Sequence, residues 1–224
     1  MVIKANALSY SYPTDHHVFK DLNFEVKEGD FWGILGRNGA GKTTLIDLIL
    51  GIKYPTSGNV TVLGENPNMK KEDHQNDVVF LSQDIKLKGD IPVHEFLKFH
   101  SFFYKKYSKE IESELLQYFE LNPKALIGAL STGQQKKVQV ISGLASDTKI
   151  ILIDEITAVL DPETRFRFFK KIMEFNKDLK KTIVLATNIA EDLKGRANKI
   201  LYINDFKADI LDPSALDTIF ITNE

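Results

Sequence analysis

Residues 36–43 read Gly36-Arg37-Asn38-Gly39-Ala40-Gly41-Lys42-Thr43, and a second threonine, Thr44, follows them. Every position fits the pattern G-x-x-x-x-G-K-[ST]. The three glycines permit a turn so tight that successive backbone N–H groups converge on one anion. Lys42 adds a mobile positive charge, and Thr43 adds a hydroxyl that suits Mg²⁺. The stretch therefore predicts a phosphate-binding loop.

The segments on either side of this loop support that interpretation. Residues 31–35 form a short apolar run typical of a buried strand, and residues 45–50 carry apolar side chains at helical spacing. A helix that starts directly after the loop directs the positive end of its dipole at bound phosphates. A glycine-rich turn without chemistry is the alternative, and the order strand, loop, helix argues against it.

The overall composition limits the classes of function. The chain has 224 residues, with 29 Lys or Arg, 31 Asp or Glu and no cysteine. This length suits one main domain with an insertion and is too short for two nucleotide-binding domains. The balanced charge indicates no nucleic-acid partner, so the pairs Lys136-Lys137 and Lys170-Lys171 are expected on solvated helix faces. The lack of cysteine excludes disulfides and thiolate metal sites and suits a reducing cytoplasm.

Alternating patterns along the chain predict the order of its elements. Residues 2–10 and 17–26 alternate apolar and polar side chains, which indicates a small antiparallel sheet joined by a turn at residues 12–15. Further strands are expected at residues 58–64, 78–81, 150–153, 182–186 and 200–203, with helical stretches between several of them. Strands that alternate with helices are typical of a mostly parallel sheet covered on both faces, so helices should cover both faces of the main sheet.

Helical spacing dominates residues 91–127. There an aromatic line, Phe96, Phe99, Phe103 and Tyr107, is expected in the core of a helical subdomain. Together the patterns predict an α/β fold: a P-loop NTPase core with a mostly parallel sheet and an N-terminal antiparallel β subdomain (residues 1–83 and 131–224), and an inserted α-helical subdomain (residues 84–130).

Two adjacent acids, Asp154 and Glu155, end the apolar strand predicted at residues 150–153. In open α/β sheets the chemistry lies at the carboxyl ends of the strands, so both side chains should face the phosphate loop. One carboxylate there can hold Mg²⁺, and a second can orient and deprotonate a water molecule that attacks a phosphate.

Ser131 and Gln134 have the spacing of a capping box at the start of a helix that runs to about residue 145. The same geometry makes a helix N-terminus that attracts a phosphate. The two interpretations coexist, because an anion site at a helix needs such a terminus.

These motifs, in this order, resemble the ATP-binding cassette of ABC transporters from Tyr12 to about Ile203. The resemblance implies ATP and Mg²⁺ as cofactors. It implies that Tyr12 stacks on adenine, although Tyr10 shares its strand face, and that Gln83 contacts Mg²⁺ and water and senses the helical subdomain. Asp161 is implied as a contact across a dimer, and Asp161-Pro162 is equally a good start for a helix.

In that family two cassettes enclose two ATP molecules, each between the P-loop of one chain and the signature segment of the other. The matching signature residues here are Ser131, Thr132, Gly133 and Gln134. A second cassette, identical or different, is therefore an implied partner.

Three positions depart from the family pattern. Thr132 stands where glycine is usual, Ile156 replaces a proline, and Asn188 occupies the position of a histidine that contacts the γ-phosphate. Asparagine can donate one hydrogen bond but carries no proton or positive charge. Because loss of one oriented donor typically costs ~10²–10³ in rate, we expect slow hydrolysis with ATP binding intact. The five histidines of the chain are expected to be surface or packing residues.

The resemblance implies an ATPase subunit that powers an integral membrane permease on a separate chain. No apolar run here approaches the ~18 residues of a membrane span. The subunit would be cytoplasmic and peripheral on the inner face of the cell membrane. Residues 127–129 lack the glutamate loop of fused exporters, and the end at Glu224 leaves no room for an importer's regulatory domain, which favours a simple export-type pair. Two alternatives stay open: a soluble cassette such as the iron–sulfur assembly ATPase, and an ATP-binding switch that hardly turns over.

Overall fold

The structure, a computed structural model, describes residues 1–13, 17–69, 76–87, 89–204 and 207–216. Its main sheet has six strands. In spatial order they are β5 (Val78–Ser82), β6 (Ile150–Asp154), β7 (Thr182–Thr187), β3 (Phe31–Gly36), β8 (Lys199–Asn204) and β9 (Lys207–Leu211). The first five run parallel and β9 is antiparallel to β8. This arrangement confirms the predicted α/β fold, and β9 is a strand that the sequence did not predict.

Helices cover both faces of this sheet, as the apolar strands require. Along β6, Ile151 and Ile153 pack with α4 (Thr132–Ala145) and α5 (Pro162–Lys177), whereas Ile150 and Leu152 belong to the cluster around α1 (Lys42–Ile49). Successive side chains of a strand point to opposite faces, so one apolar run serves two cores. The sheet is thereby fixed on both sides of the strand ends that carry the site.

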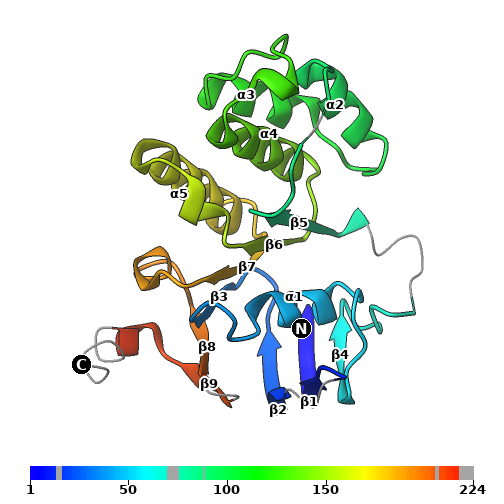
Figure 1. Cartoon of the computed structure of the whole chain (residues 1–224), viewed down its shortest axis with the longest axis vertical. Coiled ribbons are helices and arrows are strands. Elements are labelled where there is room, and N and C mark those ends of the chain that lie inside the picture. Colours follow the sequence, from blue (N-terminus) through cyan, green and yellow to red (C-terminus); the bar gives the residue numbers. More distant parts are fainter. Residues whose placement is uncertain (14–16, 70–75, 88, 205–206, 217–224) are drawn as a thin grey trace.

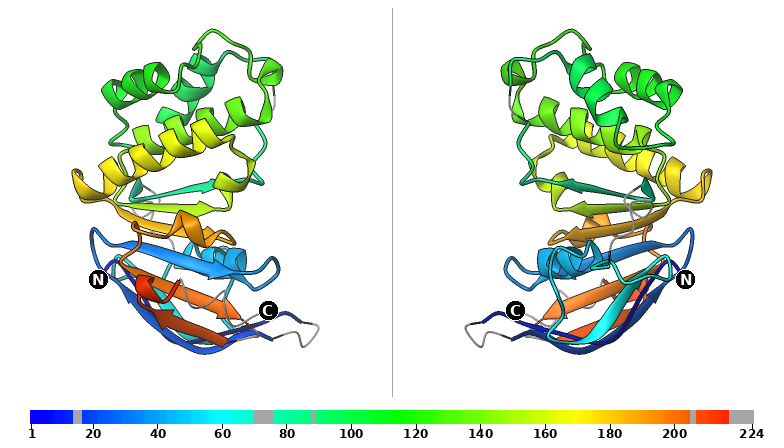
Figure 2. Two further views of the ribbon diagram at one scale, coloured as in Figure 1. Left: turned by 90° about the vertical axis from the view of Figure 1, so that its left-hand side faces the viewer. Right: turned by 90° about the vertical axis from the view of Figure 1, so that its right-hand side faces the viewer.

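A second, antiparallel sheet has the strand order β2 (His17–Val26), β1 (Ile3–Ser11) and β4 (Ser57–Val62). Its buried side chains share a core with α1. Figure 2 shows this sheet curving beneath the main sheet, at the opposite end of the molecule from the helical layer. The predicted antiparallel subdomain is confirmed, with β4 as its third strand. Residues 14 and 15 of the predicted turn lie outside the described residues.

The helical layer consists of α2 (Val93–Ser101), α3 (Lys109–Tyr118) and α4, and α4 packs on both other helices and on β5 (Figure 1). Within the described residues no helix is both long and apolar enough to span a membrane. Short 3₁₀ turns occur at η2 (Ile127–Ala129), η3 (Ile156–Val159), η4 (Ala190–Asp192) and η5 (Pro213–Ala215).

The expected aromatic core of this layer is wrong in part. Phe99 and Phe103 each expose 59% of their surface, while Val93 and Leu97 take the buried face of α2. The helix ends at Ser101, so the helical period that linked Phe99 to Phe103 does not persist.

The expectation of solvated lysine pairs is also wrong at two positions. Lys136 is 3% exposed and Lys171 8% exposed. Lys171 forms ion pairs with Glu114 of α3 and Glu174, and Lys136 donates to the backbone carbonyls of Ser82 and Gln83 at the end of β5. Charge patterning indicates a solvated face but cannot reveal a tertiary partner that satisfies an ammonium group.

The described histidines are structural, as expected. His17 hydrogen bonds with the Ser11 hydroxyl, His94 with the carbonyl of Pro123 and His100 with the Ser146 hydroxyl. His16 and His74 lie outside the described residues.

Candidate nucleotide site

The phosphate-binding loop connects the end of β3 to the first turn of α1. Gly41, the residue before α1, has φ +102°, and a Cβ there would lie 2.2 Å from Cγ1 of Val18. Only glycine fits both the positive φ and this close approach. The loop is therefore tightly turned because the antiparallel sheet packs directly against it.

Lys42 lies inside the loop, with 3% of its surface exposed. Its Nζ donates hydrogen bonds to the carbonyls of Gly36 at 2.9 Å and Arg37 at 3.0 Å, and it forms an ion pair with Glu155 Oε1 at 2.9 Å. The ammonium group thus connects the loop to the acid that ends β6.

Asp154 lies next to Thr43, whose hydroxyl donates to Asp154 Oδ2 at 2.8 Å. The other carboxylate oxygen, Oδ1, is buried and has no hydrogen-bond partner among the described residues. Burial raises the pKa of Asp154, against the opposing effect of the Thr43 hydrogen bond. A buried carboxylate oxygen without a partner is suited to a hard cation such as Mg²⁺.

Within the described residues no group of three His, Cys, Asp or Glu side chains could enclose a metal ion. Mg²⁺ does not require such a cage, since it is usually held by one or two protein groups together with waters and phosphate oxygens. Thr43 and Asp154 fit that pattern.

Glu155 is held by both of its carboxylate oxygens. Gln83 Nε2 donates to Oε2 at 3.0 Å, and Lys42 pairs with Oε1. The backbone of Glu155 is left-handed, with φ +51°, and its N–H donates to the carbonyl of Ala186 at 3.0 Å. A non-glycine residue in this region marks local strain of the kind that concentrates at functional sites.

These groups line a pocket of about 400 Å³. Its lining also includes two residues that were not predicted from the sequence, Val18 and Asp84. The lining residues are Tyr12, Val18, Asn38, Gly39, Gly41, Lys42, Thr43, Thr44, Gln83, Asp84, Asp154 and Glu155. Asp84 directly follows Gln83, which could have suggested it, whereas no local signal distinguishes Val18.

The aromatic residue of this pocket is Tyr12 and not Tyr10. The Tyr12 hydroxyl shares a 2.9 Å hydrogen bond with the Thr44 hydroxyl. Tyr10 packs edge-on against Tyr12, with ring centroids 5.2 Å apart, and does not line the pocket.

The signature segment, residues 131–134, lies outside the pocket. Its predicted capping box is confirmed: the Ser131 N–H donates to Gln134 Oε1 at 2.9 Å, and the Gln134 N–H donates to Ser131 Oγ at 3.3 Å. Ser131, Thr132 and Gln134 are exposed, and a Cβ added at Gly133 would meet no atom within 4 Å. This end of α4 is therefore capped but uncovered.

Asp161 and Asn188 also lie outside the pocket. Asp161 caps α5, and hydrogen bonds from the side chain and N–H of Thr164 hold its pKa below the ordinary value. Asn188 Nδ2 donates to Asn38 Oδ1 at 2.9 Å and lines a neighbouring pocket of about 420 Å³ with Arg37. Ile156, the third departure from the family pattern, is fully buried in the core beside Glu155.

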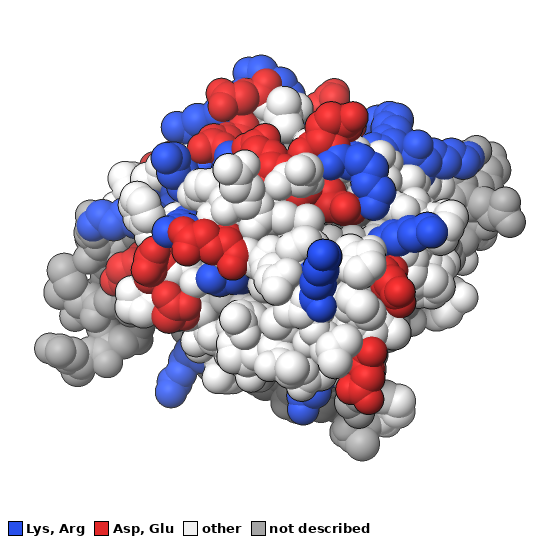
Figure 3. All heavy atoms as spheres, turned by 90° about the horizontal axis from the view of Figure 1, so that it is seen from above, with Lys and Arg blue, Asp and Glu red and all other residues white. Residues whose placement is uncertain are grey.

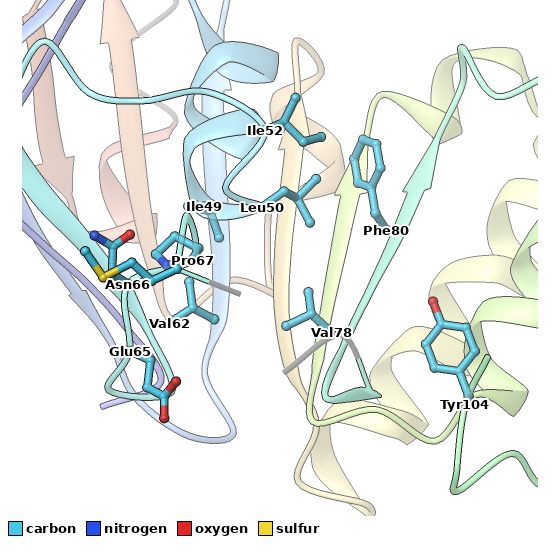
Figure 4. Close-up of a pocket in the computed structure, with 11 residues that line it drawn as sticks. Ile49, Leu50, Ile52, Val62, Glu65, Asn66, Pro67, Val78, Phe80 and Tyr104 are labelled. Atoms are coloured by element: carbon cyan, nitrogen blue, oxygen red, sulfur yellow. The ribbon is translucent and has the colours of Figure 1, made fainter. Parts of the chain in front are cut away.

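An apolar pocket of about 320 Å³ lies away from these groups (Figure 4). Ile49 and Leu50 at the end of α1, Phe80 of β5 and Tyr104 of the helical layer contribute to it. Sequence reasoning missed it because its walls come from segments that are distant in the chain.

On the face in Figure 3, acidic and basic side chains are interspersed.

Comparisons with known proteins identify the family of the chain. A family model described as "ABC transporter" matches residues 19–158. The methionine import ATP-binding protein MetN of Clostridium tetani is 29% identical over 86% of this chain and 64% of its own length. The molybdate import ATP-binding protein MolC of Haemophilus influenzae is 29% identical over 88% of this chain and 77% of its own length. The chain spans about 61 to 65% of the length of the first MetN relatives.

Among solved structures, a dimer of the ATP-binding cassette MJ0796 in a post-hydrolysis state, with ADP and Pi, has a TM-score of 0.82 and 24% identity. The match covers 94% of this chain and 98% of that one, and at this identity it shows the fold. The family match covers more than half of the chain and includes the phosphate loop, the signature segment and both acids. The chain belongs to the family of ABC transporter ATP-binding proteins.

Proposed function

We propose that this chain binds and hydrolyses ATP with Mg²⁺ as one of two cassettes that power a separate membrane permease. One observation carries the proposal: a single pocket joins the phosphate loop, the Thr43–Asp154 pair with its unpartnered oxygen, and the Gln83–Glu155 pair.

The residues of the pocket divide the work of binding. The loop N–H groups and Lys42 bind the phosphates, and Tyr12 provides the ring for adenine. Thr43, Asp154 and Gln83 would hold Mg²⁺, which when bound neutralises charge on the phosphate oxygens.

Glu155 positions the attacking water in this proposal. Its two oxygens are occupied by Lys42 and Gln83 in the nucleotide-free chain. A bound phosphate competes with Glu155 for the Lys42 ammonium, because an oxygen of a doubly charged phosphate group is a stronger hydrogen-bond acceptor than an oxygen of a singly charged carboxylate. Release of Oε1 from Lys42 leaves an acceptor for a water proton, while Gln83 keeps the carboxylate oriented.

The second chain contributes the signature segment, residues 131–134, and Asp161 in this proposal. Its support is that these residues lie outside the pocket and that the start of α4 is exposed. Asn188 bonds to Asn38 at the edge of the pocket but does not line the pocket itself, which supports slow turnover in a pair that has asparagine in both sites.

The permease is proposed to contact the surface of residues 84–130, where Phe99, Phe102 and Phe103 are exposed. Such a partner would hold the subunit at the inner, cytoplasmic face of the membrane. The sequence favoured export, whereas both named relatives are import proteins, so the comparisons lend export no support. We propose import as the direction that these relatives favour.

The proposal is tested by Mg²⁺-dependent ATP hydrolysis in the wild type and in Asp154→Asn. We expect the variant to lose at least about 30-fold in kcat, since a charged metal ligand worth ~2 kcal/mol is gone. Asp77→Asn, which removes a carboxylate paired with Lys149 outside the pocket, is the control and should keep its rate. Wild-type activity in Asp154→Asn would contradict the proposal.

The same variant has an opposite effect on folding. Because burial raises the pKa of Asp154, its ionised form destabilises the nucleotide-free chain at neutral pH. Asp154→Asn should therefore raise the free energy of unfolding at pH 7, as measured by chemical denaturation. As pH falls toward the ordinary Asp value of 3.8, the wild-type carboxyl takes up a proton in the folded state first and this advantage disappears.

A further inference from the structure

Lys136 is a buried cation on α4, two residues after the signature segment. Its Nζ donates to the backbone carbonyls of Ser82 at 3.1 Å, Gln83 at 2.6 Å and Ile85 at 2.8 Å. These carbonyls belong to residues 82–85, which we call the β5 loop. The lysine thereby connects the signature helix to the segment that carries Gln83.

The surroundings of Lys136 explain why it stays in this position. Burial lowers the pKa of Lys136, against the attraction of the Asp84 carboxylate, which accepts no hydrogen bond from it among the described residues. Burying an ammonium group is costly unless acceptors replace its water, and the three carbonyls do so. Gln139, one turn further along α4, accepts a long hydrogen bond of 3.5 Å from Lys136 and donates to the carbonyl of Ile85.

The β5 loop leads directly to the acids of the site. The Gln83 N–H donates to the Asp154 carbonyl at 3.1 Å, and its side chain donates to Glu155 Oε2 at 3.0 Å. A shift of the loop relative to α4 would move the Gln83 amide away from that carboxylate.

We propose that Lys136 is a positioning residue: by fixing the β5 loop to α4, it keeps the Gln83 amide on Glu155 and transmits the position of the signature helix to the attacking water. This inference rests on the proposed ATPase function. Lys136 does not line the nucleotide pocket, so it acts through Gln83 and not on the substrate.

Lys137 is a matched control on the same helix. Its Nζ donates to the carbonyl of Phe119 at 3.4 Å, at the end of α3, and among the described residues it makes no hydrogen bond to the β5 loop. Lys136→Met and Lys137→Met remove the same ammonium group from neighbouring positions.

The first test is steady-state ATP hydrolysis. Lys136→Met should lower kcat about 10-fold, since small misplacements of an orienting group cost one to two orders of magnitude, with KM for ATP within about twofold. Lys137→Met should keep its kcat. In the Gln83→Ala background, Lys136→Met should cause no further loss, because both changes remove the same interaction. Unchanged kcat in Lys136→Met, or losses that multiply in the double variant, would overturn the inference.

The second test does not depend on hydrolysis. Amide hydrogen exchange of residues 83–87, measured without nucleotide, should be faster in Lys136→Met than in the wild type and unchanged in Lys137→Met. Equal exchange in all three proteins would overturn the inference even in an active ATPase. A wild type that hydrolyses no ATP but shows this difference would instead contradict the proposed function and leave the fixed loop supported.

Lys136→Gln addresses the case in which the methionine variant does not fold. A glutamine keeps a neutral donor, so kcat should fall about threefold, less than in Lys136→Met, while Lys137→Gln stays at the wild-type rate. A Lys136→Gln protein that is indistinguishable from Lys137→Gln in rate and exchange would overturn the inference.

Discussion

The P-loop region and the signature segment differ in how far this chain completes them. Around the P-loop, Lys42, Glu155 and Gln83 bond to one another inside one pocket. At the signature segment, the side chains of Ser131 and Gln134 each accept a hydrogen bond from the N–H of the other residue, and the start of α4 faces solvent. The first region has its contacts within this chain, whereas the second has an exposed helix start. In the proposed function, one chain therefore supplies halves of two different sites.

The largest expected effect comes from a change in the P-loop region. Lys42→Ala removes the cation that the phosphates would contact. The free energy of ATP binding should therefore weaken by about 2 to 3 kcal/mol, which raises the Kd roughly 30- to 150-fold. Lys53→Ala is the control, since Lys53 pairs with Asp47 outside the pocket. Equal ATP affinity in a folded Lys42→Ala protein would remove the basis for the nucleotide site.

A smaller effect is expected from a change in the signature segment. Gly133→Asp adds a negative charge where the partner's phosphate is proposed to bind, and the open space there should leave the fold intact. We expect kcat to fall by roughly 30-fold, about 2 kcal/mol of like-charge repulsion, with ATP affinity of the isolated chain unchanged. Gln117→Asp adds the same charge to the exposed side of α3 and should have no effect. A fully active Gly133→Asp protein would show that the two regions do not cooperate.

The smallest effect concerns Asn188, which lies beside the loop but outside its pocket. Asn188→His restores proton handling and charge, so kcat should rise about 10-fold, below the ~10²–10³ of a whole oriented donor, with little change in ATP affinity. Glu191→His, which places an imidazole on an exposed turn nearby, is the control. An unchanged kcat in a pair of identical chains would mean that this position does not limit hydrolysis.

The structure of the P-loop region was also easier to predict from the sequence than the rest of the molecule. The P-loop and the strand that ends at Asp154 are specified by local residues, and parallel topology brings their ends together. Tertiary partners escaped prediction because they depend on distant backbone. The carbonyls around Lys136 and the pairing of Asn188 with Asn38 are examples.

The helical layer and the edge of the main sheet were predicted less well, each for its own physical reason. Its aromatic period was continued past Ser101, where α2 ends, so Phe103 was wrongly placed in the core. In the edge strand β9, Lys207 and Asp209 alternate with apolar residues and three of the five residues are exposed, so it lacks the continuous apolar run by which the inner strands were found. The role of the signature segment cannot be derived from one chain at all, because its proposed partner is another molecule.

The central claim is that ATP joins the P-loop of one chain to the signature segment of a second. It is tested most directly by the solution mass of Glu155→Gln with ATP and Mg²⁺. That variant should bind ATP but not hydrolyse it, so the account predicts a stable dimer that dissociates when ATP is removed and does not form in Glu155→Gln/Gly133→Asp. An ATP-bound Glu155→Gln protein that stays monomeric at every concentration tested would contradict the account.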